Sequence, residues 1–107
     1  MATFGEFIRK ERNKKGLNQS DFGQQFGIIM TDMSKIENGK KKFPSIHLDK
    51  LAGFLEIDVM KVKDLFVADI LVEEAHKYEC SDAVFSVAES QSRYNKEKNV
   101  KQSKMKF

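Results

Sequence analysis

The stretch from Gln19 to Glu37 constrains the fold of this chain more than any other part of the sequence. It predicts two short helices, at about 19–26 and 30–37, separated by a tight turn at Gly27, where positive φ favours glycine. Gly23 leaves room for the second helix to cross closely over the first. The apolar positions, three or four apart on one side of each helix, are Phe22, Phe26, Ile28, Met33 and Ile36. Together these features indicate a helix-turn-helix.

An ordinary helical hairpin inside a core would share this apolar pattern, so the outward positions decide between the two readings. The outward residues of the second helix are mostly short or polar: Met30, Thr31, Asp32, Ser34 and Lys35. A basic run, Lys40–Lys42, follows directly. A short polar face beside a basic run favours a binding surface over a buried hairpin.

The residues before this stretch predict one further helix. Thr3 and Glu6 form a capping box at the start of a helix over about 3–15, and Gly16 is a natural terminator. Asn18 is a good N-cap for the helix that follows.

The residues after this stretch predict three more helices and little strand. The expected N-caps are Ser45 for a helix at about 46–55, Asp58 for a helix reaching Tyr78, and Ser81 or Asp82 for the last helix. The residues expected to be buried by the fourth and fifth helices are Ile46, Leu48, Leu51, Ala52, Leu55, Val59, Val62, Leu65 and Phe66. The chain is therefore expected to be all-α.

Charge is distributed unevenly along the chain, although the net charge is only +3. Residues 1–15 and residues 34–50 each carry five basic and two acidic side chains. Residues 56–82 carry three basic and eight acidic side chains, and residues 93–107 carry six and one. This polarity suits a protein that presents one face to a polyanion, although charge runs also serve solubility alone.

Composition argues against a secreted, membrane or enzymatic protein. No export signal follows Met1, and no run of ~20 apolar residues is present to span a bilayer. The single Cys80 cannot form an internal disulfide, which predicts a cytoplasmic location. His76 and Cys80 are four residues apart, but a zinc site would need two further ligands. We therefore expect no catalytic residue, no metal and no cofactor.

Residues 4–66 resemble the helix-turn-helix domain of the phage lambda repressor and Cro type, the XRE family of transcriptional regulators. The residues that carry the resemblance are Arg9, Arg12, Gly16–Gln19, Phe22, Gly27, Met33–Lys40 and Pro44. The resemblance implies a five-helix repressor/Cro-like domain that binds double-stranded operator DNA, usually as a symmetric homodimer.

The resemblance also implies roles for individual residues. The base-facing positions would be Met30, Thr31, Ser34 and Lys35, and the phosphate-contacting positions Gln19, Asn38, Lys40 and Lys41. Arg12 and Glu37 would form a structural ion pair. Lys35 would donate to a guanine or, equally, meet only a phosphate.

Three residues depart from the family pattern. Ile29 stands where Ser or Thr often caps the recognition helix, and Met30 where a polar side chain often reads a base. Asp32 brings a negative charge near the expected DNA face, or leans back to the helix start, where a carboxylate is favoured.

Two functions follow from the sequence. The first is a sequence-specific DNA-binding transcriptional regulator, most simply a repressor of a palindromic operator; phage repressor, restriction–modification controller and antitoxin all remain open. The second is a protein-interaction module, such as an antitoxin or anti-regulator, whose acidic C-terminal helices bind a protein partner. The expected organisation is a DNA-binding domain over 1–66, a helical extension for dimerisation or partner binding over 67–93, and a basic, flexible tail over 94–107.

Overall fold

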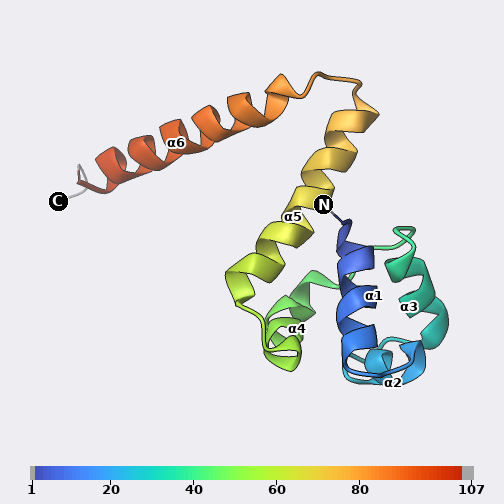
Figure 1. Cartoon of the computed structure of the whole chain (residues 1–107). Coiled ribbons are helices and arrows are strands. Elements are labelled where there is room, and N and C mark those ends of the chain that lie inside the picture. The colour runs from blue at the N-terminus through green and yellow to red at the C-terminus, as the bar shows by residue number, and fades with distance from the viewer. Residues whose placement is uncertain (1, 105–107) are drawn as a thin grey trace. The chain divides into compact units, whose positions relative to one another are not determined.

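The computed structural model describes residues 2–104, with side chains as far as Asn99, and is all-α over this range, as expected (Figure 1). The elements are α1 (Phe4–Lys14), α2 (Gln19–Gln24), α3 (Met30–Glu37), the 3-10 turn η1 (Ser45–His47), α4 (Leu48–Leu55), α5 (Val59–Lys77) and α6 (Ala83–Lys104). They form two compact units, an N-terminal unit over Met1–Ile70 and a C-terminal unit over Leu71–Phe107, which share the continuous helix α5.

The first two helices begin at the predicted caps. Thr3 Oγ1 accepts from the Glu6 backbone N–H at 3.2 Å, and Asn18 Oδ1 accepts from the Asp21 N–H at 2.7 Å. Gly16 takes a left-handed φ of 69° after α1. α2 is shorter than predicted, because residues 25–27 form the turn instead of a last helical turn.

The start of the fourth helix differs from the sequence-based expectation. Ser45 is not a side-chain cap; it begins the 3-10 turn η1, which leads into α4 at Leu48. Ile46, predicted to be buried, is 83% exposed. The helical periodicity that linked Ile46 to the buried Leu48 and Leu51 does not apply in a 3-10 turn, where three residues complete a turn.

The core of the N-terminal unit is rich in phenylalanine. Its buried apolar residues are Phe4, Ile8, Phe22, Phe26, Met33, Ile36, Phe43, Leu48, Leu51, Ala52, Leu55 and Val62. The Phe26 ring meets Phe43 and Phe54 edge-on at centroid distances of 5.4 and 5.9 Å. Phe4 meets Phe66 of α5 edge-on at 5.3 Å, so the first part of α5 closes the core beside α1.

Asp69 of α5 also holds the beginning of α1. Its Oδ2 accepts from the Phe4 backbone N–H at 2.9 Å, which pairs one of the N–H groups that a helix start leaves without an intrahelical partner. A carboxylate is also favourable beside the positive end of the helix dipole. The long sequence separation hides this contact from a local reading of the sequence.

The C-terminal unit contains the end of α5 and α6. α5 ends at Lys77, Glu79 adopts a left-handed φ of 54°, and α6 begins at Ala83, next to the predicted cap residues. Helical geometry continues from Ala83 to Lys104, beyond residue 93 where the extension was expected to end. The flexible tail over 94–107 stays a prediction, and residues 105–107 lie outside the described range. Over the described residues, no helix is long and apolar enough to cross a membrane.

Candidate nucleic-acid interface

The helix-turn-helix is formed by α2, the turn after it, and α3. Gly27 has φ 67° in this turn, a left-handed conformation that a side chain would strain. A Cβ on Gly23 would lie 2.3 Å from the Ile28 carbonyl oxygen and 2.8 Å from Met33 Cγ. Glycine at both positions therefore allows the tight crossing of the two helices.

A second close approach joins α1 to the end of α3. A Cβ on Gly5 would lie 2.4 Å from the carbonyl oxygen of Ile36 and 2.6 Å from that of Glu37. The close approach at Gly5 was not predicted, because a lone glycine within an amphipathic helix carries no local signal of what packs against it.

Glu37, at the end of α3, connects the first three helices. Its side chain is 0% exposed, and Arg12 of α1 donates through Nε to Oε2 at 2.7 Å and through Nη2 to Oε1 at 3.0 Å. Gln19 of α2 donates to Oε1 at 3.2 Å, and Arg9 of α1 donates to the same oxygen at 3.3 Å. The carboxylate thus fixes the position of α3 relative to both α1 and α2.

This arrangement keeps Glu37 ionised although it is buried. Burial by itself would raise the pKa of the Glu37 carboxyl, but the hydrogen bonds from Arg12 and Gln19 and the positive charge of Arg12 outweigh it, so the pKa is lowered. The same pairing raises the pKa of Arg12. Removal of either partner would leave a buried charge without compensation.

The four residues proposed to face bases lie on the outer side of α3. Met30, Thr31 and Lys35 are exposed, and Ser34 is half-buried. Met33 and Ile36, on the opposite side of the helix, are buried. Since residues four apart lie on the same face, Met30 with Ser34 and Thr31 with Lys35 form two adjacent rows on one accessible surface.

The residues proposed to contact phosphates differ in how they are held. Gln19 is half-buried and its amide donates to Glu37, while Asn38 Oδ1 accepts from Arg9 Nη2 at 2.8 Å. These contacts orient both amides from within the protein. Lys40 is exposed beyond the end of α3, and Lys41 Nζ lies 3.0 Å from Asp32 Oδ2. Lys41 therefore offers less net positive charge than the sequence suggests.

The beginning of α3 shows the consequence of Ile29. Ile29 occupies the N-cap position with extended backbone, makes no side-chain cap hydrogen bond, and is exposed together with the neighbouring Met30. Asp32, in the first turn, is paired with Lys41. The start of α3 therefore presents two apolar side chains, one at the position where a polar N-cap is common and one where a polar side chain often contacts a base.

Arg9 is a further residue at this surface that the sequence analysis did not assign to the site. It is half-exposed and connects Glu37 to Asn38 through separate guanidinium nitrogens. Its position three residues before Arg12, on the same side of α1, was the available signal.

The fold and this surface define a helix-turn-helix protein. No protein-family model matches the chain, and no curated protein sequence matches it significantly. Among solved structures, a chain described as "SinR protein/SinI protein complex" is similar, with 24% sequence identity and a TM-score of 0.49 over 89% of this chain and 99% of that chain. A function for this protein therefore has to be argued from its own residues.

Proposed function

We propose that this protein is a sequence-specific DNA-binding transcriptional regulator, most simply a repressor, that acts in the cytoplasm on a palindromic operator as a homodimer. The observation that carries the proposal is the accessible outer face of α3. The Glu37 cluster, which consists of Glu37, Arg9, Arg12 and Gln19, holds this helix in place. A major groove about 12 Å wide admits one α-helix, and sequence is read there by side chains on the helix surface that reach the base edges.

In this mode α3 enters the major groove and α2 crosses the phosphate backbone. Met30, Thr31, Ser34 and Lys35 face base edges. The exposed apolar side chain of Met30, 57% exposed, suits a thymine methyl group better than a hydrogen-bonding base edge.

Phosphate contacts set the position of α3 in the groove. Gln19 at the start of α2, and Asn38, Lys40 and Lys41 after α3, are the groups proposed for this role. Gln19 donates to Glu37, and Asn38 accepts from Arg9. Because these bonds already orient the two amides, less conformational entropy is lost when they bind a phosphate. A dimer would place two α3 helices about 34–36 Å apart, which matches half-sites about one helical turn apart.

Selection of binding sites from a random duplex library, followed by titration at two salt concentrations, tests this proposal. The expected result is a paired, inverted motif whose binding weakens steeply with salt, because lysine–phosphate contacts release counterions. Equal affinity for the selected site and for random duplex would refute sequence-specific recognition.

Lys35→Ala separates the two roles open to Lys35. If Lys35 reads a guanine, the substitution costs roughly tenfold or more in affinity and relaxes the preference at one base pair. If it meets a phosphate, affinity falls on all sequences alike and the salt slope decreases by about one. Lys61→Ala, at an exposed position on α5, is the matched control and leaves binding within about twofold.

A protein-interaction module is the second candidate function. The observation that favours it is the exposed apolar surface of the C-terminal unit, which includes Leu71, Phe85 and Val87. A library selection that enriches no motif, together with capture of one defined protein through residues 67–93, would support this function over DNA recognition.

A further inference from the structure

The start of α3 carries two large apolar side chains that are exposed to solvent. Ile29 is 66% exposed and Met30 is 57% exposed. The preceding residue, Ile28, is half-buried and packs against the core, so the core takes up the first isoleucine and not the second. The nearby carboxylate of Asp32 is paired with Lys41 at 3.0 Å. Ile29 and Met30 therefore form an apolar end on a helix whose outer surface is otherwise polar.

Isoleucine at the N-cap position makes α3 less stable than a polar residue would. Ile29 has the extended backbone of an N-cap, and its carbonyl oxygen accepts from the Met33 N–H at 3.0 Å, but its side chain makes no cap hydrogen bond. A serine side chain there would pair one of the N–H groups at the helix start and would stabilise α3. Residues that break a local rule in this way are expected at functional sites. Contact of the Ile29 side chain with a ligand would account for its presence.

The major groove of DNA offers one apolar group that fits this end of α3. Among the four bases, only thymine presents a methyl group there, at C5. The other groups on the base edges are hydrogen-bond donors and acceptors, which Ile29 cannot pair and Met30 pairs only weakly. 5-Methylcytosine carries the same methyl group on the same carbon. Because apolar contacts are non-directional, such a contact would accept the methyl group from either base.

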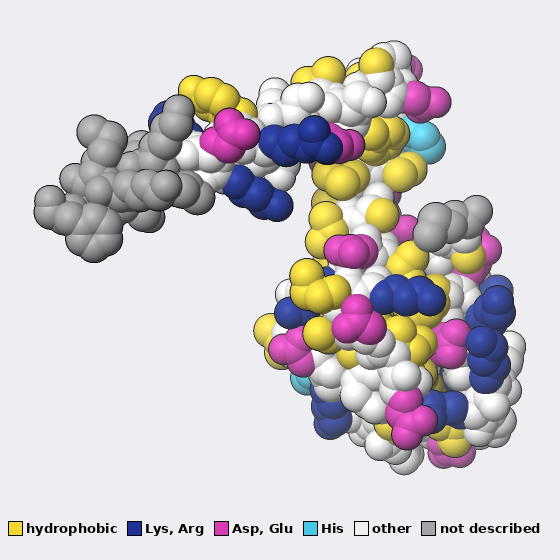
Figure 2. Space-filling model, turned by 60° about the vertical axis from the view of Figure 1, so that its left-hand side comes forward, with side chains coloured by type: hydrophobic (Ala, Val, Ile, Leu, Met, Phe, Trp, Pro, Cys, Tyr) yellow, Lys and Arg dark blue, Asp and Glu magenta, His cyan; other side chains and the backbone are white. Residues whose placement is uncertain are grey.

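The positive charge of the N-terminal unit cannot distinguish these bases. On the face that Figure 2 shows, Lys and Arg side chains (dark blue) are spread over this unit among Asp and Glu side chains (magenta). Contacts between lysine and phosphate attract any duplex, whatever its sequence. A preference between duplexes that differ only at C5 of their pyrimidines would therefore come from the helix in the groove and not from the charged side chains.

We propose that the apolar end of α3 reads the C5 methyl group of a pyrimidine, in thymine or in 5-methylcytosine. The proposal rests on the proposed function in one respect, the entry of α3 into the major groove, and it needs no defined operator. It adds a regulatory consequence to that function, because methylation of a contacted cytosine would strengthen binding. Ile29, to which the resemblance gave no base-facing role, becomes a specificity-determining residue beside Met30.

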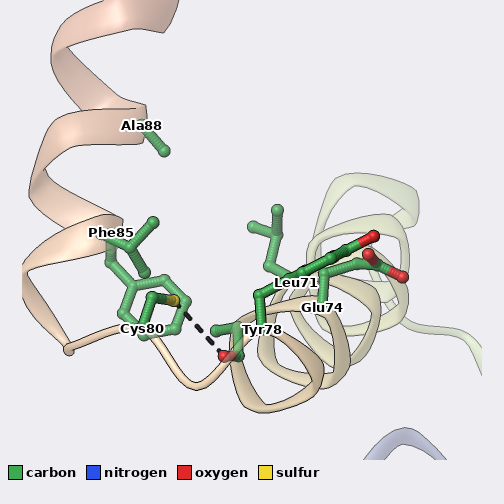
Figure 3. Close-up of a pocket in the computed structure, with 8 residues that line it drawn as sticks. Leu71, Glu74, Tyr78, Cys80, Phe85 and Ala88 are labelled. Atoms are coloured by element: carbon green, nitrogen blue, oxygen red, sulfur yellow. Dashed lines mark hydrogen bonds between the residues drawn. The ribbon is translucent and has the colours of Figure 1, made fainter.

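Duplexes that differ only in C5 methyl groups test the proposal. Four duplexes of equal length are compared: alternating A–T, the same duplex with deoxyuridine in place of thymidine, and alternating G–C with cytosine or with 5-methylcytosine. Cys80, the only cysteine of the chain, is exposed in the C-terminal unit (Figure 3), so a fluorophore attached there reports binding by anisotropy and leaves α3 unmodified. The methylated member of each pair is expected to bind at least about fourfold more tightly, the gain from burying about one methyl group.

Substitution at the apolar end connects the preference to these two residues. Ile29→Ser combined with Met30→Ser is expected to lower the affinity ratio of each pair below about twofold, while affinity for the methyl-free duplexes stays within about threefold of wild type. A serine N-cap stabilises the helix, so urea unfolding should show no loss that could explain the change. Ile46→Ser combined with Met60→Ser is the matched control, because these residues are 83% and 59% exposed and lie outside α3, and it should keep the ratio.

Each outcome of this experiment decides the proposal. Equal affinity for methylated and methyl-free duplexes would overturn it, and so would a ratio that persists in Ile29→Ser combined with Met30→Ser. A preference for thymine over uracil without one for 5-methylcytosine over cytosine would show that more than the methyl group is read, which also overturns it. A methyl preference without any motif in the library selection would support the proposal and refute only the defined operator. Absence of binding to all four duplexes would contradict the proposed function, and this proposal would fail with it.

Discussion

Glu37 joins α3 to both α1 and α2 through its buried carboxylate. Four N–H groups from Arg9, Arg12 and Gln19 converge on one carboxylate whose side chain has no exposed surface. Sequence alone suggested the pairing of Arg12 with Glu37 through a resemblance. The convergence of Gln19 and Arg9 on the same oxygen depends on how three helices pack, and no local pattern contains that information.

Glu37→Gln is predicted to destabilise the protein by about 3 kcal/mol, because it removes one partner of a buried ion pair and leaves Arg12 without its counter-charge. The free energy of unfolding from urea titration measures this loss. Asp49→Asn, which breaks the exposed pair of Asp49 with Lys63, is the control and costs about 0–1 kcal/mol.

The Glu37 carboxylate also makes the free energy of unfolding depend on pH. The pKa of Glu37 is lowered in the folded protein, so its contribution is complete above the ordinary glutamate pKa of 4.5 and is lost as the pH falls through the lower, folded value. The free energy of unfolding of the wild type is therefore predicted to fall more steeply below about pH 4.5 than that of Glu37→Gln. Parallel pH profiles for the two proteins would contradict this account.

Gly5 and Gly53 make a matched pair of helical glycines. Gly5→Ala is predicted to cost about 1–3 kcal/mol, because its Cβ would meet two carbonyl oxygens of α3 that cannot move independently. Gly53→Ala, in α4 with open space around it, is predicted to stabilise by about 0.5–1 kcal/mol through helix propensity. Thermal unfolding of both variants measures the difference, and equal effects would show that the close approach of α1 to α3 is absent.

At the scale of the elements, sequence periodicity predicted those helices in which buried side chains recur with the 3.6-residue period of an α-helix. α3 has its predicted bounds, and α1 and α2 start at their predicted caps. The prediction that Ile46 is buried was wrong, because the 3-10 turn before α4 has three residues per turn and not the 3.6 of an α-helix. Nothing in the composition of this turn marks the change. The exposed apolar side chains of α5, among them Met60, Val67 and Leu71, were also not predicted, because a helix with apolar residues on two sides gives no single periodic signal.

The sequence predicted which residues form the outer surface of α3, but it did not predict how their charges pair. Asp32 neutralises part of Lys41 across 3.0 Å, a pairing that depends on how the loop after α3 folds back. The sequence showed a basic run beside an acid and could not show which lysine the acid would meet.

Asp32→Asn is predicted to raise affinity for duplex DNA of any sequence, by about threefold to tenfold at low salt, because it releases Lys41 to a phosphate and removes a negative charge from the DNA face. The salt slope of binding should increase by about one. Titration of a random duplex at several salt concentrations measures both. Asp49→Asn, on α4, is the control for the loss of one carboxylate, and an equal gain from that variant would mean that net charge alone is responsible.

At the scale of the whole molecule, the proposed function would give DNA binding to the N-terminal unit and dimerisation to the helical extension that starts at residue 67. In this proposal α3 would be the recognition helix of each copy, and one helix contacts only a few base pairs. The proposed homodimer would join two such units, so that the second half-site binds at a high effective concentration.

Leu71→Glu places a charge on an exposed apolar position of the expected dimerisation extension, and it is therefore predicted to separate the two contributions on DNA. Affinity for a duplex with one half-site should stay within about twofold of wild type, while affinity for the paired site should fall roughly 100-fold, because the second contact is no longer tethered to the first. Fluorescence anisotropy with one-half-site and two-half-site duplexes measures both values. Val72→Glu is the control, because Val72 is the next residue, is also exposed and lies on a different side of α5, and it should leave both values unchanged. Equal losses on the two duplexes would indicate damage to the N-terminal unit. Unchanged affinity on both would mean that Leu71 takes no part in joining the two copies on the paired site, and the link between the C-terminal unit and operator symmetry would be lost.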